Sequence, residues 1–435
     1  MINEIQSLYS TEHNQQIRSL IAKHFIPSND EKKRNAEVST PVNLVDEMMD
    51  KIPLDFWKTP KKVLEPCCGK GNFILAIFDK FFNGLEEIIP DVIQRCYIII
   101  DCIYFSDINP LNILISTELL KCHIRYYGGI EVIDCFHSNI GDSLKLNSIE
   151  KWGLEAFDAV IGNPPYNSPG KTATGNTIWQ YFVLNSINIL KMDGYLCFIH
   201  PNGWRKPNER SRYKELFKKM TRENIILYLE IHDLNDGKKV FCCGTCYDWY
   251  VLQRKINNNH KTIIVDQQGV KIDINLFVWN WLPNFNIVEI GKILLKDGEI
   301  HCNSFLNSSY DTRKKWVQEK ETEEFKYPLI HSTLKNNVVR YFFTNDNTKS
   351  VFGISKVIFG ESGINTPIID MEGKYGTTQH AIGIVVENIE EAINVKNALM
   401  SVKFKDFLKA CSWSIFRVDW RIFTYLRRDF WKDFS

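Results

Sequence analysis

The sequence predicts an α/β protein with a Rossmann-like, mostly parallel sheet, followed by a C-terminal domain of mixed α+β structure. From about residue 61 to 255, short apolar runs rich in β-branched and aromatic residues alternate with helix-like segments. That alternation is typical of a parallel sheet with helices on both faces. It stops after about residue 258. The 435 residues, 44% of them hydrophobic, are enough for two domains that each have a core.

Seven strands are expected in the first region. They are residues 61–66, 101–107, 130–136, 157–165, 194–201, 224–232 and 246–255. Helices are expected at residues 71–82, 109–122 and 177–191. The segment between the last two strands is too short for a crossover between parallel strands, so these two should pair antiparallel at one edge of the sheet.

Three segments are expected along the chain. Residues 1–35 form an N-terminal helical extension, because Ile5, Leu8, Ile17 and Leu20 have helical spacing. Residues 36–258 form the first domain, and residues 259–435 form the second. No internal repeat or low-complexity tract is visible.

Composition excludes several classes of protein. The chain has a net charge of +1, and no apolar run reaches the roughly 20 residues that span a bilayer. Its start is polar, so we expect no membrane association and a cytoplasmic location. Most of the twelve cysteines lie singly or as neighbours in apolar stretches, which is typical of reduced core thiols. Cys242, Cys243 and Cys246 lack a second ligand pair at zinc-finger spacing, so no metal site is expected.

The stretch "VLEPCCGKGNF", residues 63–73, reads as a strand, a glycine-containing loop and a helix, which is the arrangement of a nucleotide-type site. It has neither the dinucleotide spacing G-x-G-x-x-G nor the Lys-Ser/Thr of a P-loop. Glu65 instead suits a cofactor with a cationic end. S-adenosylmethionine, which carries an ammonium and a sulfonium, meets this requirement.

Two further carboxylates follow predicted strands. Asp107, in "SDINP", should bind the ribose hydroxyls, although it follows Glu65 by more than the roughly 20 residues usual in dinucleotide folds. Asp101 is the competitor, but it lies inside an apolar run. Asp142, in "NIGDSL", could accept the amino group of the cofactor's adenine, or could be an ordinary turn aspartate.

The stretch "GNPPY" ends the fourth expected strand, where open α/β sheets bind ligands. Pro164 and Pro165 fix φ and remove two N–H donors, so the backbone there presents rigid carbonyls. The Asn163 side-chain oxygen and the Pro164 carbonyl can accept both hydrogens of a planar amino group, while Tyr166 stacks on the attached ring. Such acceptors favour the pyramidal nitrogen of a methyl-transfer transition state.

With these motifs the chain resembles the N6-adenine DNA methyltransferases of the gamma motif order, which are common in restriction-modification systems. The resemblance covers roughly residues 34–255 and rests on "NAEVSTPVNLVDEMM", "EPCCGKGNF", "SDINP", "NIGDSL" and "NPPY" in that order. It implies a class I methyltransferase sheet, S-adenosylmethionine as cofactor and double-stranded DNA as partner. Because a base inside a duplex cannot reach such a pocket, it also implies that the target adenine is flipped out.

The resemblance implies roles for individual residues. The implied catalytic residues are Asn163, Pro164, Pro165 and Tyr166. The implied cofactor-binding residues are Thr40, Pro41, Glu65, Pro66, Gly69, Gly71, Phe73, Asp107, Ile108, Asp142 and Ser143. Thr40 would help to hold the methionine end of the cofactor. Phe241 would contact the flipped base, or it is a core phenylalanine. The departures from the family are Cys67-Cys68, where small residues are usual, and the long stretch before Asp107.

The second domain is expected to recognise the DNA target. Its expected contacts are Arg313, Lys314, Lys315, Arg427 and Arg428, which alternate with or adjoin aromatic residues. The alternative is an amphipathic packing segment with solvated arginines. We expect a monomer that works in a bacterial cytoplasm, or a virus-encoded protein in its host.

Two other functions share parts of this pattern. Enzymes that methylate a glutamine side chain or an exocyclic amine in RNA use the same Asn-Pro-Pro-Tyr pocket. They typically carry an Asp-rich first motif and lack the Thr-Pro segment and the large C-terminal domain. A catalytically silent DNA-binding protein or a nuclease fusion is the third possibility, but no convincing PD…(D/E)xK set is present and the Asn-Pro-Pro-Tyr motif is intact.

Overall fold

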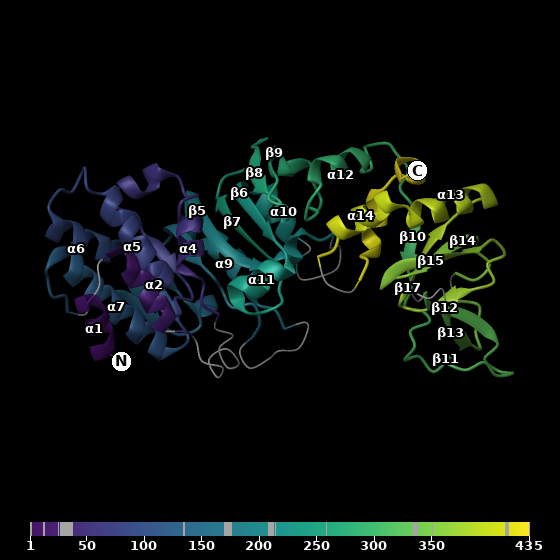
Figure 1. Cartoon of the computed structure of the whole chain (residues 1–435), viewed down its shortest axis with the longest axis horizontal. Helices are drawn as coiled ribbons and strands as arrows, with labels where there is room; N and C mark the ends of the chain where they lie inside the picture. The colour runs from purple at the N-terminus through teal and green to yellow at the C-terminus, as the bar shows by residue number, and fades with distance from the viewer. Residues whose placement is uncertain are drawn as a thin grey trace. The chain divides into compact units, whose positions relative to one another are not determined.

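The chain folds into two compact units in the computed structural model (Figure 1). The first unit comprises residues 1–204 and 210–280, and the second comprises residues 205–209 and 281–435. The structure describes residues 2–11, 14–24, 26, 38–133, 135–168, 176–207, 213, 215–257, 259–333, 338–349, 351–413 and 417–434. No helix in these ranges is both long enough and apolar enough to span a bilayer.

A nine-stranded sheet forms the centre of the first unit. Its strands are β1 (Val63–Glu65), β2 (Ile103–Asp107), β3 (His137–Ile140), β4 (Phe157–Gly162), β5 (Leu190–Pro201), β6 (Ile225–His232), β7 (Tyr247–Gln253), β8 (Thr262–Val265) and β9 (Lys271–Ile274). They are arranged in the order β3-β2-β1-β4-β5-β7-β6-β8-β9. Neighbours from β3 to β5 are parallel, so their carboxyl ends meet at one edge. The predicted α/β class with a mostly parallel sheet is confirmed.

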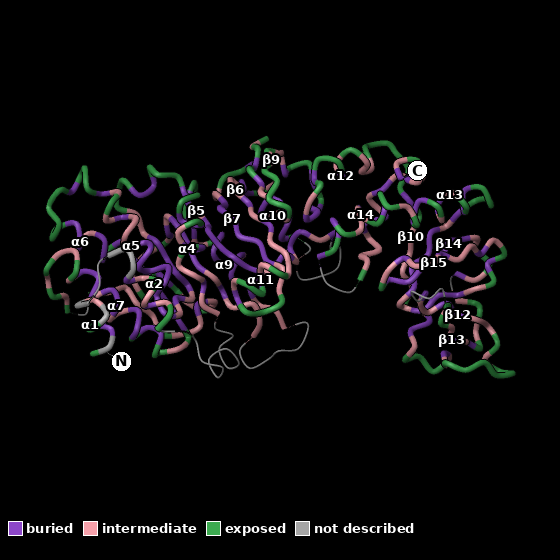
Figure 2. Tube along the Cα trace, viewed as in Figure 1, coloured by how far each residue is buried: buried purple, intermediate pink, exposed green. Residues whose placement is uncertain are grey.

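Helices connect and cover these strands. They are α1 (Ile2–Thr11), α2 (Asn14–His24), α4 (Val42–Met49), α5 (Asn72–Gly84), α6 (Val92–Cys102), α7 (Pro110–Gly128), α8 (Ser148–Trp152), α9 (Trp179–Ile189), α10 (Leu216–Thr221) and α11 (Leu234–Phe241). The apolar run that opens α5 is buried in the same core cluster as residues of the central strands. Figure 2 shows these strands as a mostly purple, buried centre of the first unit. This packing directs the N-terminus of α5 toward the loop that follows β1.

Helix α6 accounts for the long stretch before Asp107. Both α5 and α6 lie between β1 and β2, so the connection is longer than in a dinucleotide fold. Asp101 lies in the last turn of α6 and not in a strand, because β2 begins only at Ile103.

The third expected strand was placed wrongly. Strand β3 consists of His137–Ile140 and not of residues 130–136. It pairs with the part of β2 that runs from Tyr104 to Asp107, and the His137 ring stacks on Tyr104 at 4.3 Å. Ile133 is 87% exposed, so the apolar pattern before β3 does not reflect burial in the sheet.

The expected antiparallel pairing of β6 and β7 is confirmed, but the pair does not end the sheet. Strand β7 lies between β5 and β6, β8 pairs parallel with β6, and β9 follows β8. The first unit therefore extends to residue 280 and not to residue 258. The segment between β6 and β7 folds as α11, whose N-cap Asp233 accepts hydrogen bonds from two backbone N–H groups.

The N-terminal helices pack on the first unit. Ile5, Ile17 and Ile21 are buried in a cluster with residues of α5 and α7. The Tyr9 hydroxyl hydrogen-bonds to His123 Nδ1 at 2.9 Å, which adds a partly buried polar contact. Residues 2–11 and 14–24 of the expected extension are helical, whereas the Leu8 side chain and the expected boundary at residue 35 lie outside what the structure describes.

The second unit has the expected mixed α+β composition. One sheet has the order β10 (Ser304–Leu306), β17 (Ala381–Val385), β14 (Lys356–Gly360) and β15 (Gly363–Asp370). The other has the order β11 (Val317–Gln318), β13 (Val339–Thr344), β12 (Tyr327–Thr333) and β16 (Gly376–Thr377). The helices are α12 (Ile287–Ile293), α13 (Ile389–Met400), α14 (Val402–Ala410) and α15 (Trp431–Phe434). Buried aromatic residues, among them Phe404 and Phe423, fill the core between α14 and the sheet that contains β14.

Candidate active site

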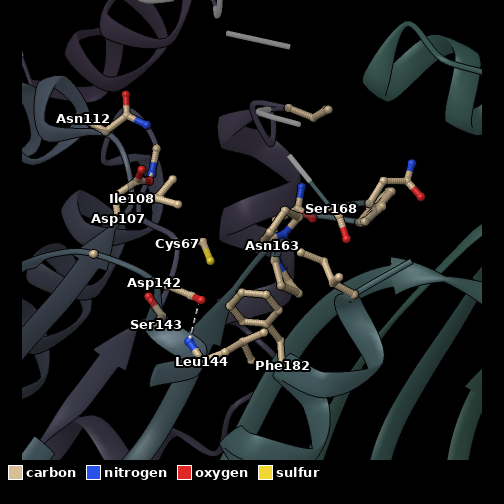
Figure 3. Close-up of a pocket in the computed structure, with 18 of the residues that line it drawn as sticks. Cys67, Asp107, Ile108, Asn112, Asp142, Ser143, Leu144, Asn163, Ser168 and Phe182 are labelled. Carbon is tan, nitrogen blue, oxygen red and sulfur yellow. Dashed lines mark hydrogen bonds between the residues drawn. The ribbon is translucent and has the colours of Figure 1, made fainter. Parts of the chain in front are cut away.

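A cavity of about 440 Å³ lies at the carboxyl ends of β2, β3 and β4 (Figure 3). Its walls come from the loops after β1, β2, β3 and β4 and from the start of α9, and two further segments contribute Val38 and Cys243. They are formed by Val38, Cys67, Gly69, Asp107, Ile108, Asn112, Gly141, Asp142, Ser143, Leu144, Asn163, Pro164, Pro165, Tyr166, Asn167, Ser168, Ile178, Phe182 and Cys243. A smaller cavity of about 30 Å³ shares some of these residues and is also lined by Thr40, Glu65 and Phe73. The fold thus brings the predicted cofactor and amine residues together.

The glycine loop after β1 is held by β2 and α7. Gly69 and Gly71 have φ values of 50° and 82°, which favour glycine. A Cβ atom at Gly71 would also lie 3.1 Å from Ser116 Oγ. The Cys68 N–H donates to the Ser106 carbonyl at 3.0 Å, which ties the loop to the end of β2. Residues other than glycine at positions 69 and 71 would therefore strain this loop conformation.

Asp107 holds the glycine loop in place. Its Oδ2 accepts a hydrogen bond from the Gly69 N–H at 2.9 Å, and its Oδ1 accepts one from the Asn109 N–H at 2.8 Å. Burial raises the pKa of this carboxyl, although these two N–H groups oppose the rise. Asp101 lies elsewhere: its side chain is 66% exposed and pairs with Lys62 and His137.

Glu65 is a buried carboxyl with an unpartnered oxygen. The residue is 1% exposed, and Oε2 has no hydrogen-bond partner among the described residues. Burial, reinforced by the nearby Asp107, raises the pKa of Glu65 well above its usual range. A buried acceptor of this kind fits a cofactor whose end is positively charged.

We expect the stability of the ligand-free protein to depend on Glu65 protonation. The folded-state pKa is raised, so the folded protein binds a proton more tightly than the unfolded chain. The free energy of unfolding should therefore fall as the pH rises from the ordinary glutamate value through the raised one. Denaturant unfolding of the wild type and Glu65→Gln, from about pH 5 to about pH 8, measures this. Glu65→Gln should lose this component of the pH dependence, and identical slopes for the two proteins would contradict the assignment.

The loop after β3 supplies Asp142 and Ser143. Asp142 Oδ1 accepts from the Leu144 N–H at 3.1 Å and so caps the short 3-10 helix Ser143–Lys145. Ser143 Oγ donates to the Pro66 carbonyl and lies 2.8 Å from Ser106 Oγ. Asp142 is thus a turn aspartate, and it also lines the cavity; its contact with the adenine of a cofactor stays a prediction.

The Asn-Pro-Pro-Tyr turn forms one wall of the cavity. Asn163 Nδ2 donates to Thr40 Oγ1 at 3.1 Å, whereas Asn163 Oδ1 is buried without a hydrogen-bond partner among the described residues. The Tyr166 hydroxyl is likewise buried without such a partner, and burial raises its pKa well above the usual range. The Ile178 N–H donates to the Tyr166 carbonyl at 3.1 Å, which fixes the turn to the start of α9.

The Thr-Pro segment lies against the glycine loop. Thr40 is 4% exposed, and its carbonyl accepts from Asn72 Nδ2 at 2.8 Å. Pro41 is the N-cap of α4, and Phe73 is buried in the core beside the smaller cavity. Residues 35–37 of this motif lie outside what the structure describes.

Sequence reasoning missed several residues of the site. Asn72 was visible in the glycine motif as its last polar residue, but its bond to Thr40 joins distant segments. Phe182 lies in α9 and Ile178 is its N-cap residue, and no local motif marks either of them as a lining residue. Leu144 is the last residue of "NIGDSL", but only the aspartate and serine of that motif were expected at the site; Figure 3 shows Leu144 and Phe182.

Some predicted contacts have other partners in the structure. Phe241 is 7% exposed and packs on Tyr247 in the core, with ring centroids 5.0 Å apart, as the alternative interpretation expected. Arg427 pairs with Asp433 at 2.8 Å, and Arg428 pairs with Glu387 at 2.7 Å. Arg313 makes two short hydrogen bonds to Asp311.

The other two predicted DNA contacts are lysines, one near an aromatic ring and one exposed. Lys314 Nζ lies 5.6 Å from the centre of the Trp316 ring, and Lys315 is exposed. In the described part of the chain, no group of three or more histidine, cysteine or acidic side chains is placed to hold a metal ion.

The fold and the site together define a class I methyltransferase-like protein with a glycine loop and an Asn-Pro-Pro-Tyr turn at one cavity. Residues 101–241 match the family model described as Eco57I restriction-modification methylase. An adenine-specific methylase of Mycoplasma pneumoniae is 27% identical over 39% of this chain and 56% of its own length. The adenine-specific methyltransferase PglX of Streptomyces coelicolor is 27% identical over 23% of this chain and 9% of its own length. These matches confirm the resemblance to adenine-specific DNA methyltransferases, and the chain spans only part of both relatives.

Solved structures support the fold. The Type IIL restriction-modification enzyme MmeI, solved in complex with DNA, aligns with 96% of this chain and 71% of its own, at 12% identity and a TM-score of 0.56. A nuclease-deletion mutant of the Type ISP restriction-modification enzyme LlaGI, solved with a DNA substrate mimic, aligns with 88% of this chain and 45% of its own, at 13% identity and a TM-score of 0.51. At these identities the alignments establish a shared fold.

Proposed function

We propose that the protein transfers a methyl group from S-adenosylmethionine to N6 of an adenine that has been flipped out of duplex DNA. The observation that carries this proposal is the Asn163 side chain. Its Oδ1 is a buried acceptor without a partner in the described structure, and it borders the same cavity as the carboxylate-rich loops. An aromatic amino group would supply the missing donor.

The cofactor site is supported by its charges and its shape. Asp107 and Asp142 line the larger cavity, Glu65 lines the smaller one, and Gly69 of the glycine loop borders both. Asp107 and Asp142 would accept hydrogen bonds from the ribose and the adenine, and Thr40 would hold the methionine end. The unpartnered Glu65 oxygen fits the positive charge there. When bound, the cofactor supplies an electrophilic methyl group on its sulfonium.

The protein's own residues prepare the amine for this transfer. Asn163 Oδ1 and the Pro164 carbonyl would each accept one amine hydrogen, which withdraws the nitrogen lone pair from conjugation with the ring. Tyr166 would stack on the base and hold the nitrogen in line. The methylated nitrogen is acidic and loses its proton afterwards, so the site needs no strong base.

The second unit is the proposed DNA-reading part. The pocket can recognise one extruded base but not the neighbouring sequence, which must be read through base edges and backbone contacts by other residues. MmeI and LlaGI, which share the fold, were solved with DNA or a DNA mimic. The DNA in those complexes supports DNA over a glutamine side chain or RNA as the proposed substrate.

The decisive experiment maps modified bases. The protein is expressed in cells that lack adenine methylation, and their DNA is sequenced with a method that detects N6-methyladenine. We expect methylation of one adenine within a defined short sequence. Unmodified DNA, together with methylation of RNA or of protein glutamine in parallel assays with the purified protein, would overturn the proposal.

Lysine and arginine contacts should differ in their contribution to DNA binding. Lys314→Gln/Lys315→Gln should reduce the slope of log affinity against log salt by about 2, because each phosphate contact contributes about 0.9. Arg427→Gln/Arg428→Gln should change this slope little, because both guanidinium groups are already neutralised by carboxylates. Fluorescence anisotropy with labelled duplex over a salt series measures both slopes. If the arginine variant instead reduced the slope and the lysine variant did not, the C-terminal arginines would be the residues that contact the DNA backbone.

A further inference from the structure

We propose that Thr40 links cofactor binding to the grip on the target amine, by setting which way the Asn163 amide faces. This inference rests on the proposed function and adds a positioning residue to it. The two residues are 123 positions apart in the sequence, yet the Asn163 amide nitrogen lies 3.1 Å from the Thr40 hydroxyl oxygen. Thr40 lines the smaller cavity next to Glu65, and Asn163 lines both cavities.

The amide of Asn163 must face one way to act. With Nδ2 donating to Thr40, Oδ1 remains as a buried acceptor for a substrate hydrogen. With the amide flipped, Oδ1 would accept from the Thr40 hydroxyl, and Nδ2 would face the target amine. Both Nδ2 and the amine are hydrogen-bond donors, so no hydrogen bond could form between them. Such a contact would leave both groups unsatisfied in a buried site, so the reversed amide could not hold the amine.

The Thr40 hydroxyl by itself permits both orientations, because it has one donor hydrogen and two acceptor lone pairs. Once that hydrogen is used elsewhere, only acceptor lone pairs are left for Asn163, and Nδ2 must face Thr40. A carboxylate at the methionine end of the cofactor is the acceptor that the proposed function places near Thr40. The bound cofactor would therefore select the amide orientation that accepts the amine.

Hydrogen bonds from Asn72 hold the Thr40 backbone in place, so that the Thr40 hydroxyl can contact both Asn163 and a ligand. Asn72 Nδ2 donates to the Thr40 carbonyl at 2.8 Å and to Ser39 Oγ at 3.1 Å. Asn72 is itself 8% exposed and begins α5 directly after the glycine loop. In the described structure the Thr40 hydroxyl has no other hydrogen-bond partner than Asn163, so its hydrogen remains available to a ligand.

The experiment measures binding to two DNA duplexes that differ only in the target base. One carries adenine at the mapped methylation site, and the other carries purine, which lacks the amino group. Affinities are measured by anisotropy without ligand, with S-adenosylhomocysteine, which keeps the carboxylate, and with methylthioadenosine, which lacks it. For the wild type we expect S-adenosylhomocysteine to raise the preference for adenine over purine by about tenfold, and methylthioadenosine to leave it unchanged.

Variants at Thr40 make the test specific. Thr40→Val removes the hydroxyl at nearly constant volume and should abolish the gain with S-adenosylhomocysteine, whereas Thr40→Ser keeps the hydroxyl and should restore it. At saturating S-adenosylmethionine, kcat of Thr40→Val should fall by about tenfold or more, while a residue that only bound cofactor would change KM and not kcat.

Two results would overturn the inference. One is an equal adenine preference of the wild type with both ligands, which needs no variant and therefore does not depend on the folding of Thr40→Val. The other is a Thr40→Val protein that keeps the wild-type gain. A wild type that methylates no adenine in duplex DNA is a different result, because it removes the proposed function itself.

Discussion

Asn163→Ala should reduce methyl transfer by about a hundredfold to a thousandfold at saturating cofactor, the usual cost of losing one preorganised transition-state contact. The variant removes the acceptor Oδ1 and leaves in place Asp107 and Asp142, which line the same cavity, and Glu65, which lines the smaller one. Single-turnover kinetics on duplex DNA give the rate, and calorimetry with S-adenosylmethionine gives the cofactor affinity. The affinity should change by less than about threefold.

Asn163→Asp is the informative companion to this variant. It retains an acceptor at the same position but replaces the Nδ2 donor that contacts Thr40. We expect a rate between those of the wild type and Asn163→Ala. If Asn163→Ala instead lost cofactor affinity and rate in the same proportion while remaining folded, Asn163 would belong to the cofactor pocket.

Asp107→Ala should weaken S-adenosylmethionine binding by about ten- to a hundredfold and should also lower the free energy of unfolding. Two partly buried backbone N–H groups, of Gly69 and Asn109, lose their acceptor, at up to about 1 to 3 kcal/mol for each group left unpaired. The cofactor also loses the hydrogen bonds to its ribose that we propose. Calorimetry measures the affinity, and denaturant unfolding measures the stability.

Asp101→Ala is the matched control, because Asp101 lies in the last turn of α6, just before β2, whereas Asp107 is the last residue of β2. The Asp101 side chain is 66% exposed, and it contacts Lys62 and His137 away from the cavity. We expect cofactor affinity to remain within about twofold of the wild type, since exposed ion pairs contribute little. If Asp107→Ala bound S-adenosylmethionine normally and Asp101→Ala bound it weakly, Asp101 and not Asp107 would be the carboxylate that binds the ribose.

The candidate site could be predicted where its chemistry is local. Gly69 and Gly71 form the turn that the glycine spacing indicated, and both have positive φ values. The two prolines and Asn163 end β4 at the cavity, as the strand pattern indicated. The stretch "DINP" reads as a strand end followed by a helix start, which favours Asp107 over Asp101, and β2 and α7 meet there. Each of these inferences used residues that lie a few positions apart.

Contacts between distant segments could not be read from the same patterns. Arg428 was expected to be free for DNA, yet Glu387 and Glu391 of another segment pair with it. Phe241 follows the family position for a base contact, but the packing of α11 against β7 buries it on Tyr247. An arginine or a phenylalanine in the sequence has the same identity whether its partner is DNA, water or another residue of the chain.

The sequence by itself determined the α/β class, the order of the motifs and the type of chemistry, because strand periodicity, glycine turns and proline geometry are properties of adjacent residues. The tertiary structure decided that β8 and β9 extend the first sheet, that the C-terminal arginines are paired, and that Thr40 meets Asn163. These outcomes depend on which segments pack together, and packing is settled by the burial of the whole core and not by any short stretch of residues.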